Sequence, residues 1–263
     1  MRKRKRKPRR SIGRGIYILP NLFTTASLFA GFFSIVSTFK GEFMAAAVAI
    51  LISAIMDALD GTVARMTHTT SQFGVEYDSL SDLVAFGVAP GILSYVWALE
   101  PFGRLGWVVA FLFVACGALR LARFNVYAGI KTDGFFQGLP IPAAAGMVAT
   151  TVFWFNYFGQ AGPIKHGAVL VLIFILSFLM VSNFRYLSLK NPELFKSKPF
   201  NTLVAVILLF SLVAVQPKVV MFLSALAYIA SGPILTVVYY KKLKQGVLEQ
   251  NDVHDDAASK SEA

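Results

Sequence analysis

The chain has 263 residues, of which 56% are hydrophobic and only 15% are charged. A soluble domain carries roughly 25% charged residues, so this composition excludes an ordinary soluble enzyme. The formal net charge of +11 could suit a nucleic-acid-binding protein, but most of the excess lies in one basic run at residues 2–10. We therefore expect no nucleic-acid partner.

The basic run is expected to form a cytoplasmic N-terminal segment over residues 1–15. Basic residues beside a membrane are attracted to anionic lipid headgroups by about 1 kcal/mol each. The run could equally serve only as a topology signal, and both interpretations place it in the cytoplasm. The apolar run that follows is too long for the core of a signal peptide and lacks a small-residue cleavage site.

Apolar runs recur between residues 16 and 240, most of them near the ~20 residues that a helix needs to cross a bilayer. They do not alternate in polarity as the strands of a membrane β-barrel do, and helices satisfy their own backbone hydrogen bonds within lipid. We predict an all-α, polytopic transmembrane helix bundle. Its expected spans number about eight, at roughly 17–39, 43–66, 77–98, 105–127, 141–160, 164–182, 200–216 and 218–240.

The loops between these spans carry an asymmetric distribution of basic residues. If the N-terminus is cytoplasmic, the outer loops hold only four of them, Lys40, Arg104, Lys165 and Lys218. Every other Lys and Arg then falls on the cytoplasmic side, as the positive-inside rule requires. We expect cytoplasmic termini, one transmembrane catalytic domain over residues 16–240, and a polar, disordered cytoplasmic tail over 241–263.

Four aspartates flank the turn between the second and third spans. Asp57 and Asp60 lie three residues apart near the end of one span, and Asp78 and Asp82 lie four apart at the start of the next. Both spacings put the two carboxylates of a pair on one helix face. Because the two spans are antiparallel neighbours, we expect all four carboxylates to converge at one membrane level.

Such convergence requires a compensating charge. An acid at membrane depth costs about 2.5–3.5 kcal/mol on insertion scales, before repulsion between the acids is counted. Oxygen-only ligands suit Mg²⁺, Mn²⁺ or Ca²⁺ rather than zinc or copper, and four carboxylates suit two metals about 4 Å apart. Two alternatives are helix-end acids exposed to cytoplasmic water and the ion pathway of a cation-coupled transporter.

The residues between the two acid pairs favour phosphate chemistry. Gly61, Ala64 and Gly74 would let a ligand approach the helix backbone closely, although helix packing explains small residues equally well. Arg65 could pair with an acid or hold a phosphate with its planar guanidinium group. Divalent cations beside an arginine are typical of phosphoryl transfer.

The whole pattern D-x2-D-G-x2-A-R-x8-G-x3-D-x3-D, from Asp57 to Asp82, resembles the signature of the CDP-alcohol phosphotransferases. The resemblance implies a six-helix core around two divalent metal ions (Mg²⁺ or Mn²⁺), CMP as leaving group, and a homodimer. It assigns Asp57, Asp60 and Asp78 as metal ligands. Asp82 would be the general base and a further metal ligand. Contacts to the CDP-lipid would come from Gly61, Ala64, Arg65 and Gly74.

Three further stretches, Pro20–Thr24, Cys116–Asn125 and Phe136–Pro142, resemble the bacterial and archaeal membrane-embedded branch of this family that uses serine. That branch implies CDP-diacylglycerol and L-serine as substrates and an active site on the cytoplasmic side of the inner or plasma membrane. It adds Asn21 to the CDP-lipid contacts and assigns acceptor binding to Arg120, Arg123 and Asn125.

The two arginines of this set do not by themselves decide the acceptor. Arg120 and Arg123 lie three apart on one helix face, where they could hold a serine carboxylate or a lipid phosphate. They could also extend towards lipid headgroups. Glycerol phosphate and inositol phosphate would be bound by arginines equally well, and choline is another acceptor of the family.

Overall fold

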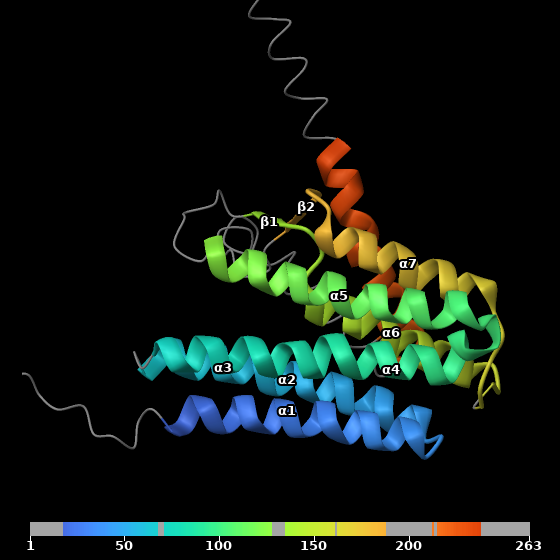
Figure 1. The fold of residues 1–263 in the computed structure, drawn as a ribbon, viewed down its shortest axis with the longest axis horizontal. Helices are drawn as coiled ribbons and strands as arrows, with labels where there is room; N and C mark the ends of the chain where they lie inside the picture. The colour runs from blue at the N-terminus through green and yellow to red at the C-terminus, as the bar shows by residue number, and fades with distance from the viewer. Residues whose placement is uncertain are drawn as a thin grey trace, which may run out of the picture.

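The computed structural model describes residues 18–67, 71–127, 135–160, 162–187, 212 and 215–237. Its long helices run side by side as a bundle (Figure 1). The elements are α1 (Ile18–Phe39), α2 (Phe43–Thr67), α3 (Gln72–Asp82), η2 (Leu83–Val88), α4 (Ala89–Ser94), η3 (Tyr95–Leu99), η4 (Glu100–Phe102), α5 (Arg104–Tyr127), β1 (Phe135–Gln137), α6 (Ile141–Tyr157), α7 (Gly167–Val181) and β2 (Arg185–Leu187). A further helix, red in Figure 1, covers Pro217–Val237.

The predicted all-α membrane architecture is confirmed. Five helices in the described part of the chain are long and apolar enough to cross a bilayer: Pro20–Phe39, Phe43–Thr67, Gln72–Phe102, Arg104–Val126 and Pro217–Val237. Large side chains such as Phe29, Phe111 and Phe178 are exposed on the outside of the bundle, as a lipid-facing surface requires. The predicted span 200–216 falls almost wholly outside the described residues, as do the segments 1–15 and 241–263.

The third membrane helix is longer than the predicted span 77–98. It begins at Gln72, because the Ser71 hydroxyl caps it by accepting a hydrogen bond from the Gly74 amide at 3.0 Å. It then continues through α3, η2, α4 and η3 to Leu99 as one rod (Figure 1). Asp78 therefore lies within the helix rather than at its start. Two stretches of this rod, η2 and η3, are π-helical.

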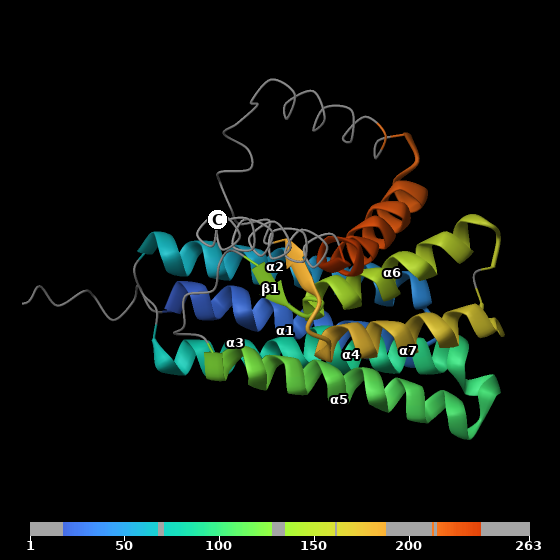
Figure 2. The same cartoon turned by 90° about the horizontal axis from the view of Figure 1, so that it is seen from above.

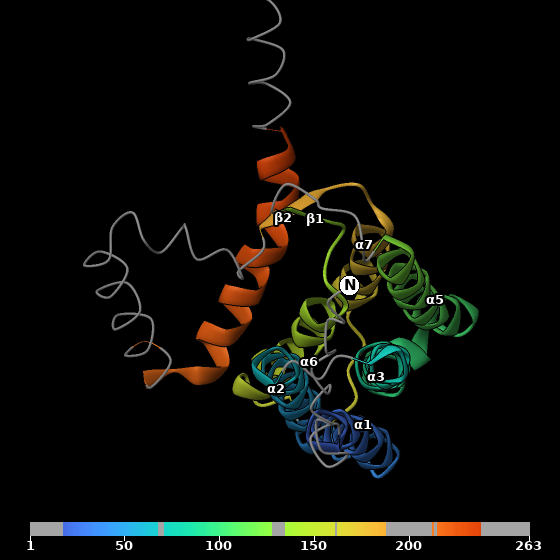
Figure 3. The same ribbon diagram turned by 90° about the vertical axis from the view of Figure 1, so that its left-hand side faces the viewer.

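Helices α6 and α7 are shorter than the predicted spans 141–160 and 164–182, at 17 and 15 residues. α6 ends early because Gly159 has φ 82, and the amides of Gly159 and Gln160 bond to the carbonyls of Asn156 and Phe155. This pair of bonds is a Schellman motif, which closes a helix C-terminus. Figure 3 shows α6 between α2 and α7, and Figure 2 shows α7 lying along α5.

Several helices approach one another through glycine. A Cβ atom added to Gly31 of α1 would lie 2.6 Å from the Ala85 Cα of η2, and one added to Gly91 would lie 2.7 Å from a methyl group of Val114. Lipid tails are as apolar as the helix side chains, so the hydrophobic effect does not drive membrane helices together. Close van der Waals packing stabilises their contacts. The contact between α1 and η2 therefore depends on a residue without a side chain.

A short antiparallel ribbon of β1 and β2, which the sequence pattern did not predict, attaches the helix Pro217–Val237. Its register pairs Phe136 with Tyr186. The fully buried Tyr186 packs its ring against Gly232, and its hydroxyl donates to the Ile229 carbonyl at 3.2 Å. Burial, with a contribution from the neighbouring Tyr228, raises the pKa of Tyr186 to about 12. The phenol therefore remains a hydrogen-bond donor at neutral pH.

Replacing Gly31 by Ala should destabilise the bundle, because the new methyl group meets the backbone of Ala85 and not a movable side chain. Overpacking of this kind costs about 1–3 kcal/mol. We expect a lower apparent Tm for the purified Gly31→Ala protein in detergent. The matched control is Gly146→Ala in α6, where a Cβ meets nothing within 4 Å and the higher helix propensity of Ala adds up to about 1 kcal/mol. Equal Tm values for the two variants would contradict the close contact.

Candidate active site

Three of the four aspartates form one compact group. Each of Asp57, Asp60 and Asp78 offers a carboxylate oxygen, and these oxygens all lie within 4.8 Å of one another. Asp57 and Asp60 come from α2 and Asp78 from α3. Asp60 is buried, and the other two are half-buried. The predicted convergence of the acid pairs is therefore confirmed for these three side chains.

Asp82 lies one turn beyond Asp78, at the junction of α3 and the π-helical segment η2. It does not belong to the group of three, but its half-buried carboxyl group interacts electrostatically with Asp57 and Asp78. It also interacts electrostatically with the guanidinium group of Arg120. Asp82 thus connects the acidic group with α5.

The geometry and chemistry of the group fit a hard divalent cation. Three carboxylates within 4.8 Å provide an all-oxygen donor set of the kind that Mg²⁺, Mn²⁺ and Ca²⁺ bind. A cation there would also offset the mutual repulsion of carboxylates held in a partly buried site.

Helix α1 contributes side chains that sequence reasoning did not select. The Thr24 hydroxyl donates to Asp60 Oδ2 at 2.9 Å, and the Ser81 hydroxyl of α3 donates to the Thr24 carbonyl at 3.0 Å. One residue later, the hydroxyls of Thr25 and Tyr77 lie 3.0 Å apart. The sequence offered one indication of a role for Thr24, its place in the stretch Pro20–Thr24. Within that stretch only Asn21 was predicted to contact a ligand.

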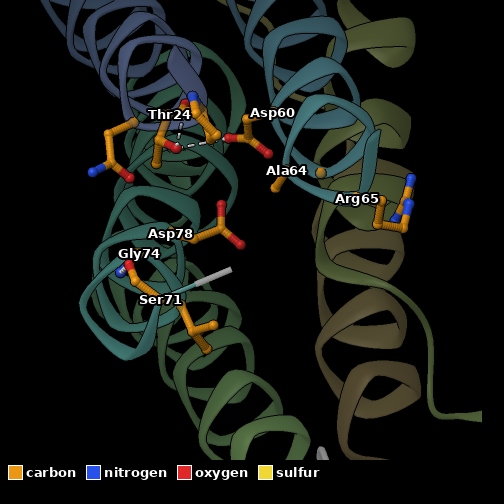
Figure 4. Close-up of a pocket in the computed structure, with 11 residues that line it drawn as sticks. Thr24, Asp60, Ala64, Arg65, Ser71, Gly74 and Asp78 are labelled. Atoms are coloured by element: carbon orange, nitrogen blue, oxygen red, sulfur yellow. Dashed lines mark hydrogen bonds between the residues drawn. The ribbon is translucent and has the colours of Figure 1, made fainter. Parts of the chain in front are cut away.

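A cleft of about 230 Å³ opens beside the acids, between α1, α2 and the start of α3 (Figure 4). Its lining comprises Pro20, Asn21, Thr24, Asp60, Gly61, Ala64, Arg65, Ser71, Gly74, Val75 and Asp78. All five residues predicted to contact a CDP-lipid are therefore gathered around one cavity, next to two of the predicted metal ligands. Figure 4 shows the Asp60 and Asp78 side chains facing this space.

A side chain would be unfavourable at the two glycines of the cleft, Gly61 and Gly74, for different reasons. A Cβ on Gly74 would lie 3.1 Å from Ser71 Oγ and 3.5 Å from Asn21 Oδ1, so a side chain there would press on the helix cap. A Cβ on Gly61 would meet only Arg65 Nη1, at 3.8 Å. A side chain at position 61 would occupy ligand space without a clash inside the protein.

Arg65 lies at the rim of the cleft and not beside the carboxylates. Its guanidinium group donates to Thr62 Oγ1 at 3.2 Å, within the same helix. Its side chain is exposed and extends away from Asp60 and Asp78 (Figure 4). This position suits a ligand at the cleft entrance better than an ion pair with an acid.

The three residues predicted to bind the acceptor do not share one set of contacts. Arg123 donates to Gln137 of β1 and, at 2.9 Å, to Asn183 Oδ1, while the Asn125 side chain donates to Ser79 Oγ of α3 at 3.0 Å. Both residues hold α5 to its neighbours. Arg120 is different, because its Nε is buried without a hydrogen-bond partner in the described part of the chain and its guanidinium group interacts electrostatically with Asp82.

A model of the CDP-alcohol phosphatidyltransferase family matches residues 17–177 of this chain. The chain belongs to this family. The match extends from α1 almost to the end of α7 and contains every residue of the acidic group and its cleft. The helix Pro217–Val237 lies beyond it. Membership of the CDP-alcohol phosphatidyltransferases confirms the resemblance seen in the sequence and makes this chain an enzyme of that family.

Individual relatives agree with this membership. The chain is 43% identical over 202 residues to a CDP-diacylglycerol–serine O-phosphatidyltransferase of Helicobacter pylori, covering 77% of this chain and 84% of the relative. It is 41% identical over 147 residues to a protein of the same name from Mycobacterium tuberculosis, covering 53% and 50% of the two chains. It is also 38% identical over 170 residues to an archaetidylserine synthase of Methanothermobacter thermautotrophicus, covering 64% and 69%.

Proposed function

We propose that this chain transfers the phosphatidyl group of CDP-diacylglycerol to the hydroxyl group of L-serine, giving phosphatidylserine and CMP. The observation that carries the proposal is the position of the acidic group beside the cleft lined by Asn21, Gly61, Ala64, Arg65 and Gly74. The names of the relatives that use serine support the choice of acceptor.

Asp57, Asp60, Asp78 and Asp82 would hold two divalent metal ions, Mg²⁺ or Mn²⁺, and the all-oxygen donor set supports this choice. Such ions, when bound, neutralise the pyrophosphate charge and stabilise the leaving group. The five cleft residues bind the cytidine diphosphate, with Arg65 at the entrance, while the acyl chains of the lipid remain between the helices and the bilayer.

Asp82 acts as the general base. It accepts the proton of the serine hydroxyl, and the serine oxygen attacks the lipid-linked phosphorus in line. The new bond joins the serine oxygen to phosphorus, the bond from that phosphorus to the CMP oxygen breaks, and CMP leaves with the electron pair. The electrostatic interactions of Asp82 with Asp57 and Asp78 and with Arg120 support this role.

The acceptor is bound by Arg120, whose Nε has no hydrogen-bond partner among the described residues and can donate to the serine carboxylate. Arg123 and Asn125 complete the acceptor-binding set by holding α5 against β1 and α3. This division of roles would bind serine near its general base, because Arg120 and Asp82 interact electrostatically.

The enzyme resides in the bacterial inner membrane, with the active site and both termini in the cytoplasm, and functions as a homodimer. The orientation is supported by the positions of Lys40, Arg104, Lys165 and Lys218 at helix ends opposite to the acids. The homodimer follows from the family resemblance. The catalytic domain spans residues 16–240, between the basic segment 1–15 and the polar tail 241–263.

A CMP-release assay on the purified protein tests the function directly. With CDP-diacylglycerol and Mg²⁺ or Mn²⁺ present, we expect CMP to appear when L-serine is added, and not with glycerol phosphate, inositol phosphate or choline. Release that responds to another of these alcohols would reassign the acceptor. No release with any of them would refute the transferase and favour a cation-coupled transporter.

Asp82→Asn should lower the turnover at least about 100-fold, since general-base catalysis contributes roughly 10²–10⁴-fold. Binding of CDP-diacylglycerol should persist, because the group of three acids and the cleft are unchanged. The matched control is Glu76→Gln, an exposed carboxylate on the same helix that does not line the cleft. Unimpaired turnover of the Asp82→Asn enzyme would remove Asp82 from the mechanism.

Arg120→Ala should raise the KM for serine by roughly 10-fold or more, because a hydrogen bond to a charged group contributes about 1.5–3 kcal/mol. The KM for CDP-diacylglycerol should change much less. Arg104→Ala, at the opposite end of α5, is the control for loss of a positive charge. If the KM for the lipid rises and that for serine does not, Arg120 binds the lipid phosphate instead.

A further inference from the structure

A buried threonine outside the acidic pattern makes a direct bond to the candidate metal site. Thr24 of α1 and Asp60 of α2 are only 4% and 5% exposed, and the Thr24 hydroxyl lies 2.9 Å from Asp60 Oδ2 (Figure 4). Water does not compete for this hydrogen bond, so the Thr24 hydroxyl can fix the orientation of the Asp60 carboxylate.

The hydroxyl has a single proton and two acceptors within reach. The second acceptor is the Pro20 carbonyl, 3.2 Å away and one turn earlier in α1. Back-bonding of this kind is the usual local option for a threonine in a helix. The bond to a charged carboxylate is shorter and stronger than one to a neutral carbonyl, so Asp60 is the preferred acceptor. The Pro20 carbonyl is the alternative acceptor for the same proton.

The bond restricts how Asp60 can present its oxygens. A carboxylate has two oxygens and about four lone-pair directions, and Thr24 occupies one direction on Oδ2. One carboxylate oxygen of Asp60 lies within 4.8 Å of carboxylate oxygens of Asp57 and Asp78, so the orientation of the group bears directly on the candidate metal site. Groups that hydrogen-bond to metal-ligating side chains in this way commonly set the affinity for the metal.

Thr24 also links the two helices that carry the acids. Its carbonyl accepts the Ser81 hydroxyl of α3 at 3.0 Å, immediately before Asp82 in the chain. One turn further along α1, the hydroxyls of Ser27 and Ser53 lie 2.7 Å apart and keep α1 close to α2. Thr24 of α1 therefore contacts both helices that carry the acids, α2 through Asp60 and α3 through Ser81.

We propose that Thr24 is a positioning residue of this enzyme, which orients the Asp60 carboxylate for divalent-metal binding through its hydroxyl group. The proposal rests on the proposed function only in that the acidic group holds a divalent cation. It predicts a loss of metal affinity when the hydroxyl is removed, whatever alcohol the enzyme uses.

The test is the Kd for Mn²⁺ of the full-length protein in lipid nanodiscs, measured from the free-Mn²⁺ signal by electron paramagnetic resonance. Thr24→Val keeps the shape and removes the hydroxyl, and Thr24→Ala removes it with a smaller side chain. We expect both to bind Mn²⁺ about 10–100-fold more weakly, as is typical for loss of a partner of a metal ligand. Thr24→Ser retains the donor and should stay within about threefold of the unmodified protein.

Thr38→Val is the matched control. Thr38 lies in the same helix and is fully buried, and its hydroxyl donates only to the Ser34 carbonyl, at 2.8 Å, among the described residues. Its loss should leave Mn²⁺ affinity unchanged, although it removes a buried hydroxyl of the same kind. A general defect in α1 would instead weaken Mn²⁺ binding in both Thr24→Val and Thr38→Val.

Three results would overturn the proposal: unchanged affinity in Thr24→Val and Thr24→Ala, equal loss in Thr24→Ser, or no Mn²⁺ binding by the unmodified protein. Serine-dependent CMP release is measured in parallel on the same samples. If that release is absent while the Mn²⁺ affinities follow the expected order, the proposed function fails and the role of Thr24 stands.

Discussion

Repulsion among carboxylates is the constraint around which this membrane bundle is arranged. The oxygens of Asp57, Asp60 and Asp78 lie within 4.8 Å of one another in a protein whose surroundings solvate charge poorly. Such a group is stable only if donors and positive charges are directed at it. The Thr24 hydroxyl supplies one donor, and Arg120 supplies a positive charge behind Asp82. A divalent cation would offset the repulsion among the carboxylates that remains.

Close helix packing keeps this group in place. Gly31 allows α1 to contact the backbone of η2 only a few residues after Asp82, and the Ser27–Ser53 hydroxyl pair joins α1 to α2. The π-helical segment Leu83–Val88 follows Asp82 directly. π-Helical turns of this type are frequent at functional sites. These contacts lie further along the helices than the acids and add to the Thr24 bonds beside them.

The cleft beside the acids and the surroundings of Arg120 are formed by different parts of the chain. The cleft beside the acids lies entirely within residues 17–177, the part matched by the family. Arg120, in contrast, interacts with Tyr228 of the helix Pro217–Val237, which Tyr186 and the β1–β2 ribbon attach to the bundle. The cleft therefore lies within the family-matched part of the chain, whereas the surroundings of Arg120 include a helix that lies beyond it.

The sequence by itself determined the membrane class, most of the helices and the convergence of the acid pairs. Those features depend on local periodicity, since apolar length predicts a span and spacings of three or four residues predict one helix face. Only the tertiary structure decided that Thr24 bonds to Asp60 and that Arg65 lies at the rim of the cleft. It also decided that Arg120 interacts with Asp82, while Arg123 and Asn125 hold neighbouring elements. It also revealed the β1–β2 ribbon. These contacts depend on the rotation and separation of helices distant in the chain, which residue spacing within one helix does not specify.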